Sequence, residues 1–116
     1  MNIIDFNYNW NNKLNNTAFT TIRLRNDKKY VINNKFYIDL HTGKNKVSKG
    51  IATIIDIKHF TINKLNNYIA FLDTGYNSTE ATRIIQTMYK NKIPPINWDT
   101  QELSLILLVK DSEPKK

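Results

Sequence analysis

Two short stretches hold the side chains whose types and spacing are best suited to chemistry. They are Thr20, Thr21 and Arg23 in the stretch TTIR, and Asp73, Gly75 and Tyr76 in the stretch DTGY. Neighbouring hydroxyls and a guanidinium supply donors at fixed spacing, and the guanidinium can bind a phosphate or carboxylate with two parallel hydrogen bonds. The glycine permits a close backbone approach, and the tyrosine offers a face on which a base can stack. These residues indicate a site for an anionic ligand.

The same residues also have purely structural explanations. Threonine is a good strand former, a charged side chain such as Arg23 is common on an edge strand, and Asn77 is a typical helix N-cap residue. From the residues alone, both interpretations remain open.

No further catalytic or metal-binding pattern is evident. His41 and His59 lie far apart, and the chain has no cysteine, so we expect neither a zinc site nor a disulfide. The stretch TGKNKVSKG lacks the spacing and the following helix of a phosphate-binding P-loop. We therefore expect no metal and no cofactor.

Alternating and continuous apolar patterns predict four strands. Residues 18–25 place Phe19, Thr21 and Arg23 on one face, which is strand periodicity. Residues 35–40 and 50–60 alternate in the same way. Residues 102–110 are almost continuously apolar, which predicts a central strand covered on both faces. The basic stretch 41–50 has glycines and is predicted to be a hairpin loop.

Helical patterns occur in the middle of the chain and near its start. Residues 9–16 are compatible with a short helical turn, and residues 61–72 predict a short helix with Thr61 as its N-cap. A turn at 73–77 follows. Residues 78–90 form the best helical pattern, because their apolar positions make one stripe, and Asn77 and Glu80 have the spacing of a capping box.

Composition bounds the class of protein. The chain has 116 residues, 41% of them hydrophobic and 23% charged, which suggests one globular domain. No apolar run approaches the ~20 residues that cross a bilayer, and the N-terminus lacks a signal-peptide pattern. We expect a cytoplasmic protein with no membrane partner. The heavy use of Asn, Ile and Lys fits an AT-rich genome, such as that of a low-GC bacterium or its phage.

Positive charge is concentrated in the first half of the chain. The net charge is +7, and residues 13–64 carry eleven Lys or Arg against three Asp. A localised basic surface attracts polyanions, although lysine is also an ordinary solubilising residue. The expected phosphate contacts are Arg25, Lys28, Lys29, Lys44, Lys46 and Lys49.

Three stretches in order resemble the ASCH domain family of the PUA-like superfamily. They are KLNNTAFTTIRL, YVINNKFYIDL and KGIATIIDIKHFTINKLNNYIAFLDTGYNSTEATRIIQTMYK, followed by the apolar closing strand. The resemblance covers roughly residues 10–110. It implies an α+β fold in which residues 1–110 form one ASCH/PUA-like domain, a small mixed β-barrel flanked by two or three helices. Residues 111–116 would be a disordered tail.

The resemblance also implies a cleft between the TxR strand and the loop before the long helix. Members of the family are thought to bind RNA or modified nucleosides, and a subset resembles amidohydrolases that deacetylate N4-acetylcytidine. Thr21 and Arg23 match the GxKxxTxR motif of the family, whereas its Lys position is Ala18 here. The loop carboxylate has no clean match, and Asp73 is the nearest acid. Lys13 is the nearest replacement for the missing lysine.

The sequence thus predicts a module that binds RNA, a nucleotide or a nucleoside without an intact catalytic set, as a monomer or small homo-oligomer. The ligand anion would be held by Thr21, Arg23 and the 73–77 loop. One alternative is an amidohydrolase acting on an acylated cytidine, with Thr21, Asp73 and Lys13 as catalytic residues. Another is a phage-type protein that binds a host protein or a signalling nucleotide.

Overall fold

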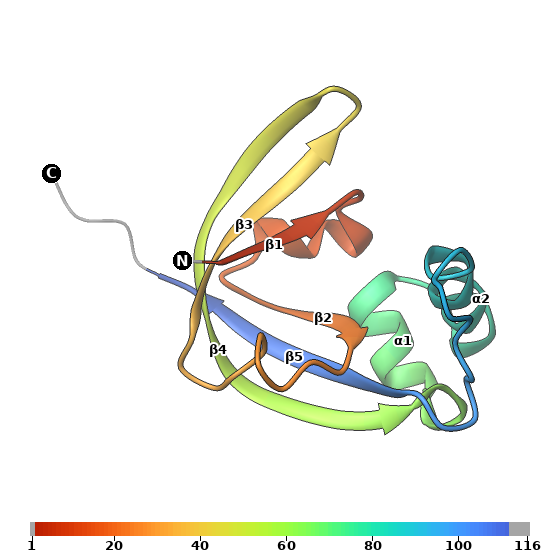
Figure 1. Ribbon diagram of the computed structural model, residues 1–116. Coiled ribbons are helices and arrows are strands. Elements are labelled where there is room, and N and C mark those ends of the chain that lie inside the picture. Colours follow the sequence, from red (N-terminus) through yellow and green to blue (C-terminus); the bar gives the residue numbers. More distant parts are fainter. Residues whose placement is uncertain (1, 112–116) are drawn as a thin grey trace, which may run out of the picture.

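The computed structural model describes residues 2–111 and combines one mixed β-sheet with short helices (Figure 1). The tail expected at residues 111–116 lies, apart from Asp111, outside the described residues. Its strands and helices follow in the order β1 (Asn2–Phe6), η1 (Trp10–Asn15), β2 (Ala18–Leu24), β3 (Lys35–Thr42), β4 (Asn45–Thr61), η2 (Ile62–Lys64), α1 (Asn67–Thr74), α2 (Ser78–Met88) and β5 (Glu102–Lys110). The predicted combination of a mixed sheet with two or three helices is confirmed. None of the helices in this part of the chain is long and apolar enough to cross a membrane.

The five strands form one curved sheet in the order β1-β3-β4-β5-β2. β1 runs parallel to β3, and the other neighbours are antiparallel. The predicted closure into a barrel is wrong, because the sheet ends at β1 and β2 without a ladder between them in residues 2–111. The position of β5 between β4 and β2 confirms the prediction of a central strand.

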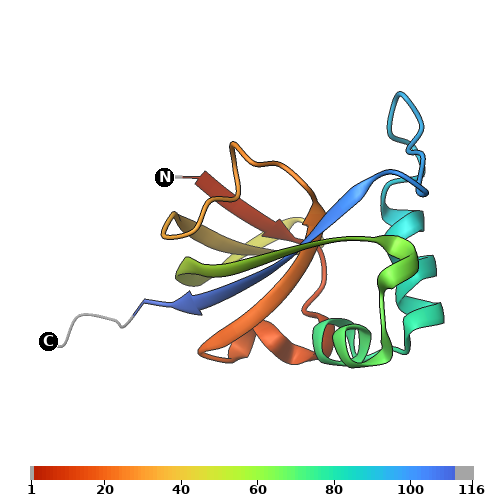
Figure 2. The same ribbon diagram turned by 90° about the horizontal axis from the view of Figure 1, so that it is seen from below.

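Two hydrophobic clusters fill the concave side and one end of the sheet. The first includes Ile4, Phe6 and Leu14, so η1 lies inside the curve of the sheet. The second joins β2 and β5 to the helices through Ile22 and Ile85. Both views place α1 and α2 together at the same end of the sheet (Figures 1 and 2). The candidate site lies where the two clusters meet.

The strand β1 is absent from the sequence prediction, and the β3–β4 hairpin differs from it. Only Ile4 and Phe6 of β1 are buried, so five residues give too short an alternation to identify the strand, and its parallel partner is distant in sequence. The stretch 41–50 is not a loop, because Thr42 already pairs with Asn45 and only Gly43 and Lys44 make the turn. Most side chains near this hairpin tip are exposed. These positions therefore need no apolar residues, and the sequence lacks the alternating pattern by which strands are identified.

The helix predicted at 61–72 is shifted toward the C-terminus. Thr61 makes no side-chain cap bond, whereas the Asn66 side chain accepts a bond from the Ile69 amide at 2.9 Å and begins α1. The helix continues through Asp73 to Thr74, so these two residues are not in a turn, and Gly75 ends it with φ 81. The Asn77 side chain caps α2 through the Glu80 amide at 2.9 Å, as predicted. The Glu80 carboxylate does not complete the capping box in the described residues, because it pairs with Arg83.

Candidate functional site

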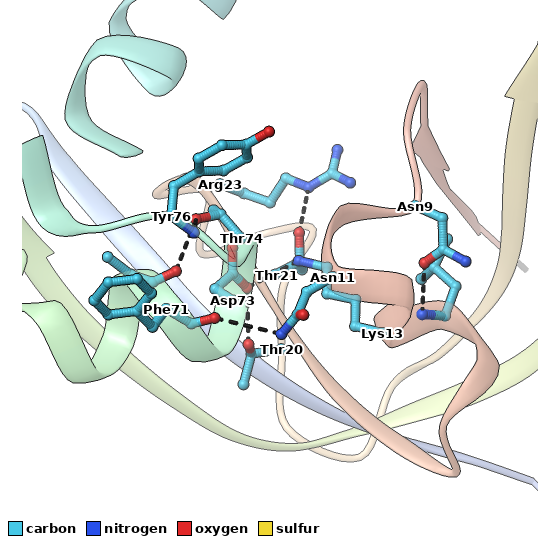
Figure 3. Close-up of polar contacts among 12 residues, drawn as sticks. Asn9, Asn11, Lys13, Thr20, Thr21, Arg23, Phe71, Asp73, Thr74 and Tyr76 are labelled. Atoms are coloured by element: carbon cyan, nitrogen blue, oxygen red, sulfur yellow. Dashed lines mark hydrogen bonds and ion pairs between the residues drawn. The ribbon is translucent and has the colours of Figure 1, made fainter. Parts of the chain in front are cut away.

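A cavity of about 170 Å³ lies at the meeting point of β1, η1, β2, α1 and α2. Its polar lining includes Lys13, Thr21, Arg23 and Asp73, and its apolar lining includes Phe6, Trp10, Ile22, Ile84, Ile85 and Met88. Four of the sequence-predicted candidates, Lys13 from η1, Thr21 and Arg23 from β2 and Asp73 from α1, therefore line one cavity. Figure 3 shows this cluster between η1, β2 and α1.

A buried ion pair forms one wall of the cavity. Lys13 Nζ lies 2.9 Å from Asp73 Oδ1, and the side chains of both residues are only 5% exposed. Thr20 Oγ1 donates to the same carboxylate oxygen at 2.7 Å (Figure 3). Burial lowers the pKa of Lys13, and the nearby charge of Arg23 acts in the same direction, while Asp73 opposes the shift. The pair is thus a charged group held in a poorly solvated place.

The opposite side of the polar lining is built by Arg23. Its Nε donates to Thr21 Oγ1 at 3.0 Å, and its Nη2 donates to the carbonyl oxygen of Asp5 at 2.8 Å. The guanidinium carbon lies 4.6 Å from the centre of the Phe6 ring, a distance at which cation–π attraction operates. Thr21 is buried. Because its oxygen accepts from Arg23, the hydroxyl hydrogen can be donated to another group.

Thr20, Gly75 and Tyr76 do not line the cavity. Thr20 supports Asp73 as described, and Gly75 ends α1 close to Asn11. Tyr76 is half exposed and meets the edge of Trp10, with ring centres 6.1 Å apart. The aromatic residue that lines the cavity here is therefore Trp10, which also contacts Tyr8, with ring centres 4.6 Å apart.

The six expected phosphate contacts do not come together at the cavity. Arg25, Lys28 and Lys29 lie between the end of β2 and the start of β3, and Arg25 is paired with Asp27 and Glu102 at 2.8 and 3.0 Å. Lys44, Lys46 and Lys49 belong to the β3–β4 hairpin. There, Lys46 is 3.6 Å from Asp39, and Lys49 donates to Asn15 at 3.3 Å.

Sequence reasoning missed the aromatic wall. Phe6, Tyr8 and Trp10 recur at every second position of FNYNW, and all three line the cavity. That spacing was the available signal, although only Phe6 lies in a strand: the chain bends at Asn7 and Tyr8, and Trp10 begins η1. Ile84, Ile85 and Met88 also line the cavity. The sequence did not indicate this, because their spacing is that of an ordinary apolar helix stripe facing a core.

The histidines serve other contacts. His41 Nε2 lies 2.7 Å from Asp5 Oδ1, and His59 Nδ1 lies 2.8 Å from Ser104 Oγ. Within residues 2–111, no group of three or more His, Asp or Glu side chains is arranged to hold a metal ion.

Comparison with known proteins gives no relative to guide the assignment. No family model, curated protein or solved structure matches the chain.

Proposed function

We propose that the chain is an ASCH-like, PUA-like module that binds a nucleotide, a nucleoside or RNA, with a base in the cavity and the ligand anion near Arg23. One observation carries the proposal. Lys13, Thr21, Arg23 and Asp73 come from three separate elements and line a single cavity that also has aromatic walls. An apolar pocket with a few convergent polar groups is the usual form of a small-molecule site.

The chemistry of the lining suits a heterocyclic base. The Lys13–Asp73 pair sets a cationic donor beside an anionic acceptor, which is complementary to the adjacent acceptors and donors on the edge of a base. Both hydrogen bonds that Asp73 accepts from side chains in the described residues go to Oδ1, so Oδ2 can accept from a ligand. The indole of Trp10 in the lining can contact the face of the base.

The size of the cavity also limits the ligand. Its volume of about 170 Å³ lies below the roughly 300–1,000 Å³ of pockets for drug-sized ligands. A single ring fits a cavity of this volume better than a whole nucleotide does. The sugar and any phosphate would lie outside the cavity, toward its mouth.

A thermal-shift screen against nucleosides, nucleotides and short RNAs tests the proposal. A ligand at 100 times its Kd stabilises the protein by about 2.7 kcal/mol, which is a shift of several degrees for a domain of this size. The shift should be lost in Arg23→Ala and kept in Arg83→Ala, which removes an exposed arginine outside the cavity. Each variant is compared with its own ligand-free melting temperature, because Arg23 also makes structural contacts.

A response from none of these compounds would contradict the proposal. It would favour the alternative in which the chain binds a protein partner. An equal shift in Arg23→Ala and in the unchanged protein would place the ligand away from the cavity.

The buried Lys13–Asp73 pair also supports a second candidate, an amidohydrolase acting on an N-acylated cytidine. Thr21 lines the same cavity and can donate its hydroxyl hydrogen, as a nucleophile must. Lys13 replaces the lysine that the family motif would place at Ala18. A lowered pKa brings a lysine closer to the range in which it can act as a base.

Release of cytidine from N4-acetylcytidine distinguishes the two candidates. An enzyme should lose this activity in Thr21→Val, which keeps the side-chain shape without the hydroxyl, and in Lys13→Met. If the unchanged protein binds N4-acetylcytidine and releases no cytidine, the binding function stands alone.

A further inference from the structure

A second depression lies next to the cavity and shares Arg23 with it. This basic groove has a volume of about 360 Å³, and its lining includes Arg23, Arg25, Lys29, Tyr30, Tyr89 and Lys92. The groove is formed by the end of β2, the segment after it and the residues that follow α2. Its lining contains four basic side chains and no acidic one.

The positive charges of the groove are unequal in their availability. Arg25 is neutralised by Asp27 and Glu102. Arg23, Lys29 and Lys92 have no carboxylate within salt-bridge distance in residues 2–111. Three cations therefore face a small open space without an internal counter-charge. Such an arrangement favours an anion from solution.

Two tyrosines add neutral donors to these cations. Tyr30 packs against Phe36 and Tyr89 packs against Trp98, with ring centres 6.1 and 6.4 Å apart. Lys29 Nζ lies 5.5 Å from the centre of the Tyr30 ring. Burial raises the pKa of Tyr30, although the charge of Arg23 opposes this shift, so its phenol remains a hydrogen-bond donor at neutral pH.

We propose that the basic groove binds a phosphate group of the ligand whose base occupies the cavity. This inference rests on the proposed function and deepens it, because it assigns the ligand class as a phosphorylated nucleoside, free or within an RNA strand. Arg23 lines both the cavity and the groove, so one ligand can extend past its side chain from the cavity into the groove. The cavity has room for a ring only, and the phosphate of a nucleotide must then lie outside, where Lys29 and Lys92 supply charge.

The test measures binding of the four ribonucleosides, their 5′- and 3′-monophosphates, a short single-stranded RNA and inorganic phosphate by calorimetry. One of the monophosphates should bind at least tenfold more tightly than its nucleoside. The double variant Lys29→Gln/Lys92→Gln should lose this preference while still binding the nucleoside. The matched control is Lys58→Gln/Lys64→Gln, which removes the same charge from two exposed lysines outside the groove and should keep the preference.

The results separate the groove from the cavity. Nucleosides that bind as tightly as their monophosphates, with dependence on Arg23, would overturn the groove assignment and leave the proposed function intact. Binding of inorganic phosphate as tight as that of the monophosphate would overturn it too, because the groove would then be a site for free anions. Absence of binding by every nucleoside, nucleotide and RNA would overturn both proposals. An RNA that binds more tightly than any monophosphate, with loss in Lys29→Gln/Lys92→Gln, would identify the strand as the source of the phosphate.

Discussion

Arg23 in β2 donates a hydrogen bond from Nη2 to the backbone carbonyl oxygen of Asp5 in β1, at 2.8 Å. These two strands are the edges of the sheet, so a side chain joins edges that no backbone ladder joins in the described residues. Phe6 and Phe19 reinforce the contact edge to face, with ring centres 6.2 Å apart. The seam between the edges is therefore closed by side chains, and the cavity opens beside it.

Arg23→Ala should destabilise the fold as well as change the site. It removes the hydrogen bonds to Thr21 and Asp5, and bonds made by charged groups are worth about 1.5–3 kcal/mol each. Arg23 is only partly buried, so in the variant water can bond to the groups that Arg23 leaves. We therefore expect the free energy of unfolding to fall by about 1–3 kcal/mol. Urea unfolding measures it. Arg83→Ala, on an exposed helix face, should change stability by less than about 0.5 kcal/mol, and an equal loss in both variants would contradict a role in the seam.

The Lys13–Asp73 pair should show strong coupling in a double-mutant cycle. Breaking a buried ion pair by removing one partner costs about 3–5 kcal/mol, because the other charge is left buried and unpaired. Lys13→Met and Asp73→Asn should each approach this cost. The double variant should be more stable than the sum of the two losses predicts, by at least about 1 kcal/mol. Additive losses would mean that the two side chains do not interact in solution.

The titration of Lys13 offers an independent check of its burial. Desolvation lowers its pKa below the ordinary value of 10.5. Between the folded-state pKa and 10.5, the unfolded chain holds a proton that the folded chain has released, so the free energy of unfolding rises with pH in that window. NMR titration of the Lys13 side chain should give a midpoint below 10.5. Across the same pH window, the free energy of unfolding should rise less in Lys13→Met than in the unchanged protein. A midpoint at the ordinary value would contradict the buried pair.

The sequence was sufficient to predict the strands with an alternating or continuous apolar pattern and the amphipathic helix. β2, β5 and α2 were predicted because each has a local pattern that burial imposes on its own residues. β1 was not, since its parallel pairing with β3 is non-local and only Ile4 and Phe6 mark its buried face. Closure of the barrel was overpredicted for a similar reason, because no local pattern reports whether two distant edges pair.

The candidate site was predictable by residue type and only partly by position. Thr21, Arg23 and Asp73 were selected for their chemistry, and the structure places them around one cavity. The resemblance already grouped Lys13 with Asp73, but their ion pair joins residues sixty positions apart, and no local pattern of the sequence indicates such a contact. Lys92 and Tyr89 were overlooked because the basic groove forms only when the segment after α2 packs beside β2.

The two helix caps can be distinguished by substitution. Asn66 accepts a bond from the Ile69 amide, whereas Thr61 makes no cap bond. Asn66→Ala should therefore lower stability by about 0.5–2 kcal/mol, and Asn77→Ala at the start of α2 should behave alike. Thr61→Ala should have a smaller effect. Helix content by circular dichroism and urea unfolding measure the losses, and a larger loss in Thr61→Ala would restore the earlier start predicted for the helix.

Thr20 and Thr21 are neighbours with identical side chains, yet they should have different effects on function. Thr20 supports the Asp73 carboxylate and does not line the cavity, whereas Thr21 lines it beside Arg23. Thr20→Val should lower stability by about 1.5–3 kcal/mol, because a bond to a buried carboxylate is lost, and ligand affinity should change little. Thr21→Val should reduce affinity about tenfold or more, since one lost donor to a ligand is worth about 1.4 kcal/mol or more. Calorimetric titration of each variant with the ligand found by thermal shift measures the difference. If Thr20→Val lost affinity and Thr21→Val kept it, the ligand would approach Asp73 from the other face of β2.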